Sequence, residues 1–115
     1  MPRKTVFDMK FSDVFPALVA KAVRKGRTED EVLEVTSWLT GYKKEQIGDL
    51  LSSEATYGIF LSGSPAYNPH SELITGKVCG IQVETIAEPL ARRMRQLDKL
   101  VDELAKGRPM EKILR

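Results

Sequence analysis

The side chains that could carry out catalysis or hold a metal are few in this chain. His70 is the single histidine and Cys79 the single cysteine, so the usual histidine and cysteine ligand set of a zinc site cannot be assembled within one chain. Asp98 and Asp102 are spaced one helical turn apart, but a hard cation needs more oxygen ligands than such a pair supplies. The sequence therefore predicts no metal site and no cofactor.

His70 and Cys79 are also the residues that an enzyme would use as base and nucleophile, and their spacing permits that arrangement. Cys79, however, lies between Val78 and Gly80, an apolar setting that is typical of a buried structural cysteine. His70 follows Pro69 and is predicted to be an exposed turn residue. We therefore expect no catalytic residue, and an enzyme is the less favoured class of protein.

Charge is distributed unevenly along the 115 residues, although the net charge is only +2. Residues 1–27 carry a net charge of +5, residues 28–75 carry −6, and residues 76–115 carry +3. The acidic segment either folds against the basic ones or leaves a basic face free for an anionic partner. The first interpretation is favoured, because the basic residues are interleaved with acidic ones and do not form a cluster.

Helix signals run through the whole chain and indicate an all-α fold. Ser12 and Gly26 bound a first helix, and a capping box at residues 28–31 begins a second helix that ends at Gly41. Further helices are predicted over residues 44–52, 54–62, 88–106 and 110–114, while residues 74–82 are left unassigned. We expect one domain, residues 1–115, folded as a small orthogonal bundle of five to seven helices in which the N-terminal pair packs across the long C-terminal helix.

The predicted long helix carries an apolar stripe with the spacing of a coiled-coil seam. Its outer face is expected to pair Lys99 with Glu103 and Asp102 with Lys106, each four residues apart. The stripe is a candidate interaction seam for a homodimer, but it is shorter than a coiled coil needs, so a core stripe is the competing interpretation. The stripe consists of Leu90, Met94, Leu97, Val101 and Leu104.

Nucleic-acid binding is the alternative function that the sequence offers. Residues 32–51 follow the general layout of a helix-turn-helix, with Gly41 in the turn, and the long helix adds a basic face. The surrounding acidic residues oppose this function, because affinity for nucleic acid depends largely on contacts between cations and phosphates. The candidate contacts are Lys43, Lys44, Gln46, Arg92, Arg93 and Arg95.

Aromatic residues gather around the turn-rich middle of the chain. Large side chains of this kind usually form the core of a small helical domain. The alternative is a cleft for a small ligand or peptide. The residues concerned are Tyr42, Tyr57, Phe60 and Tyr67.

Several strings of the sequence resemble an uncharacterised bacterial family, domain-of-unknown-function family 2200. They include Trp38-Leu39-Thr40-Gly41-Tyr42 and residues 73–76, 79–81, 98–107 and 109–115. The resemblance covers nearly the whole chain and is strongest from residue 68 to residue 115. It implies a small, helical, cytoplasmic bacterial protein, and it implies no activity, cofactor or functional residue.

Together these patterns favour a non-enzymatic protein-interaction module, with a protein partner or a second copy of the chain. Nucleic acid is the less favoured partner. No apolar run approaches the roughly 20 residues of a membrane-spanning helix, so no membrane association is expected. The single cysteine fits a reducing compartment, and the expected location is the cytoplasm.

Overall fold

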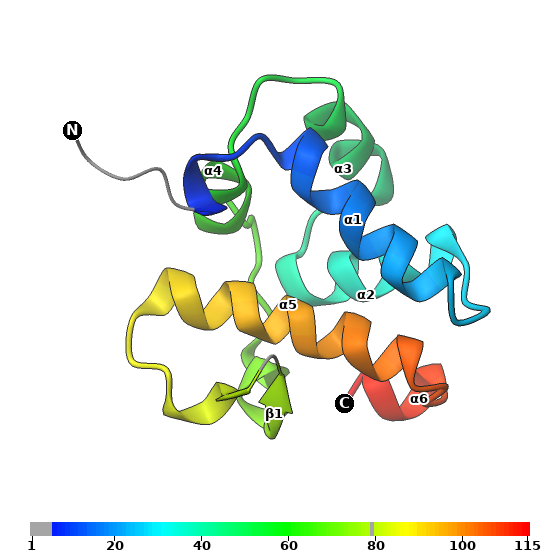
Figure 1. The fold of residues 1–115 in the computed structure, drawn as a ribbon. Helices are drawn as coiled ribbons and strands as arrows, with labels where there is room; N and C mark the ends of the chain where they lie inside the picture. Colours follow the sequence, from blue (N-terminus) through cyan, green and yellow to red (C-terminus); the bar gives the residue numbers. More distant parts are fainter. Residues whose placement is uncertain (1–5, 79) are drawn as a thin grey trace.

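The computed structural model describes residues 6–78 and 80–115. Six α-helices lie in this part of the chain (Figure 1), which confirms the prediction of a mostly helical fold with five to seven helices. Three short 3₁₀ helices and one two-stranded hairpin connect them. In chain order the elements are η1 (Val6–Asp8), α1 (Phe11–Val23), α2 (Glu29–Thr40), α3 (Lys44–Leu51), α4 (Tyr57–Ser62), η2 (Pro69–Leu73), β1 (Lys77–Val78), β2 (Ile81–Gln82), η3 (Val83–Thr85), α5 (Pro89–Ala105) and α6 (Met110–Ile113).

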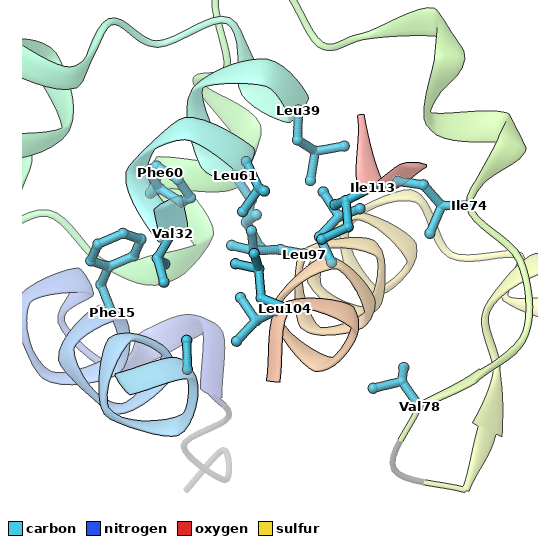
Figure 2. Packing of buried hydrophobic residues seen from close by; sticks show 14 of the residues in the cluster. Phe15, Val32, Leu39, Phe60, Leu61, Ile74, Val78, Leu97, Leu104 and Ile113 are labelled. Carbon is cyan, nitrogen blue, oxygen red and sulfur yellow. The ribbon is translucent and has the colours of Figure 1, made fainter. Parts of the chain in front are cut away.

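Helix α5 crosses the middle of the molecule, and most other elements pack against it (Figure 1). Helices α1 and α2 contact it, as the sequence predicted for the N-terminal pair. Helices α4 and α6, the hairpin and η3 contact it as well. Its buried residues meet those of α1, α2 and α4 in the core shown in Figure 2, and the fully buried apolar residues of α5 are Leu97, Leu100, Val101 and Leu104.

Helix α1 begins at Phe11, so the prediction that Ser12 caps it is wrong. The chain just before the helix pairs with the segment that leads into α4. The Phe11 N–H donates to the Ala55 carbonyl at 2.9 Å, and the Tyr57 N–H donates to the Met9 carbonyl at 2.8 Å. These long-range backbone bonds fix the start of the helix, which no local capping pattern could reveal.

Helix α2 begins as its sequence predicted. The Thr28 hydroxyl accepts a hydrogen bond from the Glu31 N–H at 3.2 Å, and the Glu31 carboxylate accepts one from the Thr28 N–H at 3.0 Å. The helix ends at Gly41, whose φ of 82° lies in the left-handed region. A Cβ at this position would come within 2.7 Å of the Ala66 backbone, so both conformation and space favour glycine here.

Residues 74–82, left unassigned by the sequence, contain a short antiparallel hairpin. Lys77 pairs with Gln82 and Val78 with Ile81, and the Val78 side chain is buried against the core. The prediction that Cys79 is buried falls on a residue outside the described part of the chain. The hairpin is a small addition to the expected all-α architecture.

A buried ion pair holds the C-terminal segment on α5. Glu103 is 4% exposed, and its carboxylate lies 2.6 Å from the Arg115 guanidinium and 3.1 Å from that of Arg108. The predicted surface pair of Lys99 and Glu103 is therefore wrong, because Lys99 instead donates to the Lys77 carbonyl at 3.3 Å. The residues after α5 fold back over it and turn this position into an interior one.

Replacing Glu103 with glutamine is expected to destabilise the protein by about 3 kcal/mol, because it leaves the largely buried Arg115 guanidinium without its counter-charge. Urea denaturation at neutral pH measures this free energy of unfolding. The exposed Glu111, on α6, provides a matched control, and Glu111→Gln should change the free energy by less than about 0.5 kcal/mol. Equal losses in the two variants would contradict a specific role for the buried pair.

Candidate functional site

The predicted interaction seam of α5 lies mostly inside the protein's own core. Leu97, Val101 and Leu104 are fully buried, and Leu90 and Met94 pack against the same core while partly exposed. Figure 2 shows Leu97 and Leu104 among the buried side chains of the neighbouring helices. In this fold α1 and α2 already cover the face that a second copy would need.

Helices α2 and α3, with residues 41–43 between them, have the layout of the predicted helix-turn-helix. Ile47 is buried, and Lys43, Lys44 and Gln46 are exposed as expected. Two of these side chains already have partners, however. The Lys44 ammonium lies 2.9 Å from the Asp30 carboxylate, and the Gln46 side-chain oxygen accepts from the Lys43 N–H at 2.8 Å. They serve the start of α3 and its contact with α2.

The three arginines of α5 have three different environments. Arg95 lies 3.4 Å from the Asp98 carboxylate. The Arg93 guanidinium lies over the Tyr67 ring, 4.2 Å from its centre. Arg92 has no carboxylate within 4.0 Å in the described part of the chain, and its Nε is buried without a hydrogen-bond partner. The helix therefore does not present these residues as one basic face.

Burial disfavours the ionisation of Tyr57, which is fully buried, and of Asp98, which is partly buried. Burial, reinforced by the nearby Asp98 charge, raises the pKa of Tyr57. Burial also raises the pKa of Asp98, although Arg95 and Lys21 act in the opposite direction. The Tyr57 hydroxyl has no hydrogen-bond partner among the described residues. Neither group lines the two cavities described next. Tyr57 belongs to the core, whereas the partly exposed Asp98 pairs with Arg95.

Two surface cavities are the candidate binding sites. The first, the arginine pocket, has a volume of about 210 Å³ and lies between η2 and the first half of α5. The second, the apolar groove, has a volume of about 230 Å³ and lies between α1, α2 and α3. Both are smaller than the roughly 300 Å³ at which sites for drug-sized ligands begin. The pocket is lined chiefly by Tyr67, Ser71, Glu72, Arg92, Arg93 and Gln96, and the groove chiefly by Phe15, Pro16, Val19, Leu33, Gly48 and Leu51.

The aromatic residues of the middle segment divide between core and pocket. Tyr57 and Phe60 are fully buried, and the Phe60 ring stacks on Phe11 with 4.1 Å between ring centres. Tyr42 is partly buried and donates from its hydroxyl to the Phe60 carbonyl at 2.9 Å. Tyr67 alone of the four lines one of the two cavities. Tyr57 and Phe60 therefore belong to the core, whereas Tyr67 lines a cavity.

The residues considered for metal binding and catalysis have other contacts. Asp102 lies 3.4 Å from Lys21 and 3.0 Å from Lys106; the second of these contacts was predicted from the sequence. His70 is exposed, and its Nδ1 lies 2.8 Å from the Arg115 carbonyl oxygen. Within the described residues, no group of three or more histidine, cysteine or acidic side chains is placed to hold a metal ion. No helix of this part of the chain is long and apolar enough to cross a bilayer.

A family model described as "Uncharacterized protein conserved in bacteria (DUF2200)" matches residues 5–115. The chain belongs to this family. It is also similar to the crystal structure of an uncharacterized protein, SP1917, with 44% sequence identity and a TM-score of 0.93 over 98% of this chain and 93% of that one. No curated protein matches the chain. The predicted DUF2200 membership is confirmed, and neither similarity assigns a function.

The buried Tyr57 hydroxyl generates a stability prediction for this DUF2200 protein. Tyr57→Phe is expected to raise the free energy of unfolding by about 1 kcal/mol, because it removes a buried polar group that has no partner in the fold. Tyr42→Phe is the matched control: it removes a hydroxyl that is bonded to Phe60, so it should lower the free energy by about 1 kcal/mol. Thermal and urea denaturation measure both changes. A lower free energy of unfolding in Tyr57→Phe would contradict the conclusion that this hydroxyl has no hydrogen-bond partner.

The raised pKa of Asp98 generates a prediction about pH. The folded state holds the Asp98 proton more tightly than the unfolded chain does, so this group lowers stability as pH rises above the ordinary aspartate pKa, through the raised value. Asp98→Asn does not titrate. Its stability relative to the native protein should therefore increase from pH 3.5 to pH 7, as urea denaturation at both values will measure. A constant difference between the two proteins would contradict the raised pKa, and the exposed Asp49→Asn serves as the control.

Proposed function

We propose that this DUF2200 chain is a non-enzymatic protein-interaction module and that the apolar groove between α1, α2 and α3 is its docking site. The supporting observation is Gly48, which lines the groove from the interior of α3. A glycine at such a position costs about 1 kcal/mol relative to alanine. A Cβ added to Gly48 would meet no atom within 4 Å, so no neighbour within the described chain requires a glycine there. The space beside Gly48, at the edge of the groove, is open.

The shape and lining of the groove suit one large apolar side chain of a partner. Phe15 is almost completely buried, while Val19, Leu33 and Leu51 are partly exposed. A partner side chain that fills this apolar cavity of about 230 Å³ removes apolar surface from water, which stabilises the complex. The cavity is small for a cofactor. A partner segment that inserts a leucine or a phenylalanine fits this site.

The charge around the groove indicates the kind of segment that would carry this side chain. On the α2 and α3 side of the groove, residues 28–51 contain six acidic residues and two lysines, a net charge of −4, whereas α1 carries one acidic residue and one lysine. One of the lysines, Lys44, lines the groove but is paired with Asp30. Complementary charge favours a basic segment. The same acidic residues oppose a phosphate backbone, which disfavours the alternative of nucleic-acid binding through α2 and α3.

A synthetic peptide tests this proposal directly. The probe is an amidated 12-residue helical peptide with a leucine stripe and lysines on its other faces, and fluorescence anisotropy measures its affinity for the protein. Gly48→Leu places a side chain in the groove and is expected to weaken peptide binding at least tenfold. Ser62→Leu adds the same side chain at an exposed position of α4 outside the groove, and it should bind as the native protein does.

Three controls distinguish binding in the groove from attraction by charge alone and from nucleic-acid binding. A peptide with alanines in place of its leucines, and one with glutamates in place of its lysines, should each bind at least tenfold more weakly. If the native protein and Gly48→Leu bound the basic peptide with equal affinity, the groove would not be the docking site. Binding of duplex DNA that falls steeply between 50 mM and 200 mM salt, and that persists in Gly48→Leu, would favour the nucleic-acid alternative instead.

A further inference from the structure

The arginine pocket is a second site, and it is independent of the apolar groove. It lies where η2 meets the first half of α5, whereas the groove lies among α1, α2 and α3. The two cavities share no lining residue. The pocket is polar and contains two arginines, so its chemistry differs from that of the groove.

One wall of the pocket is held in place by a network of hydrogen bonds. Gln96 is 3% exposed; its side-chain nitrogen donates to the Ser71 carbonyl at 3.2 Å, and its side-chain oxygen accepts from the Tyr67 hydroxyl. The Arg93 guanidinium lies over the Tyr67 ring and donates to the Leu61 carbonyl at 2.7 Å. Burial raises the pKa of Tyr67, which therefore stays protonated and remains the donor. These bonds fix the wall before any ligand arrives.

Arg92 is the lining residue whose hydrogen-bonding capacity the described fold leaves unfilled. No carboxylate of the described residues lies within 4.0 Å of its guanidinium, and its Nε, which is closed off from solvent, has no acceptor in the described fold. A buried N–H without an acceptor is unfavourable, and a guanidinium in a cavity offers its donors in a fork that matches an anion. We propose that the arginine pocket binds a small carboxylate, which accepts hydrogen bonds from the Arg92 guanidinium.

Charge and size select a carboxylate over a phosphate. Arg93 is committed to Leu61 and Tyr67, so Arg92 is the arginine left to neutralise a ligand. Glu72 also lines the pocket, and its negative charge repels a dianion more strongly than a monoanion. A volume of about 210 Å³ admits a short carboxylic acid and is small for a nucleotide.

Titration of the ¹⁵N-labelled protein with propionate tests this proposal, with 1-propanol as the uncharged probe and inorganic phosphate as the competing anion, all at constant ionic strength. Propionate is expected to shift the Arg92 Nε–H resonance saturably, and propanol is expected to leave it in place. The backbone amide of Gln96 then reports affinity in the variants. Arg92→Lys, which keeps the charge but replaces the forked donors of the guanidinium by one ammonium group, should bind propionate at least tenfold more weakly.

Two further variants serve as a control outside the pocket and as a second test of the pocket. Arg24→Gln removes an exposed arginine at the end of α1 and should bind propionate as the native protein does. Glu72→Gln removes the repelling charge and should bind about twofold more tightly, which tests the site even if Arg92→Lys does not fold. The proposal is overturned if Arg92→Lys binds like the native protein, if Arg24→Gln loses as much affinity, if Glu72→Gln binds no better, or if phosphate binds more tightly than propionate.

Discussion

The central position of α5 is the constraint on which the rest of the structure depends. Helices from both ends of the chain pack on it, so even some of its polar residues are buried. Gln96 is accommodated by bonds to Tyr67 and the Ser71 carbonyl, and Glu103 by the guanidinium of Arg115. Because an unpaired buried polar group lowers stability, these residues favour the positions in which η2 and the C-terminal segment lie against the helix.

Local chemistry in the sequence was sufficient to predict most helix boundaries. The Thr28 capping box begins α2, and Gly41 ends it. The long helix lies within the predicted residues 88–106, because the Glu88 side chain caps it by accepting from the N–H groups of Leu90 and Ala91. In each case the decisive interactions join residues within a few positions of one another, so a single sequence contains the whole signal.

Features that depend on contacts between distant segments could not be predicted in this way. Helix α1 begins early because Phe11 bonds to the Ala55 carbonyl, and Glu103 is buried because residues 108–115 return to it. The apolar stripe of α5 was ambiguous for a related reason. A spacing of four and three residues serves a core and a dimer equally well, and only the positions of α1 and α2 decide which one this fold uses. The six candidate nucleic-acid contacts were likewise chosen by residue type, which does not reveal that Lys44 is paired with Asp30.

Each candidate site contains either a polar group without a hydrogen-bond partner or a glycine beside open space. The surroundings of such a group decide whether it indicates a binding site. The hydroxyl of Tyr57 and the Nε of Arg92 are both buried and unpartnered in the described structure. Tyr57 lies in the closed core, where no ligand can reach it, so its hydroxyl is a cost to stability with no implied partner. Arg92 lines a cavity, so an anion from solution can reach its guanidinium, although the Nε itself is closed off. Gly48 is the apolar counterpart, because the space beside it opens into a groove. Such a position therefore indicates binding only where the residue that carries it lines a cavity.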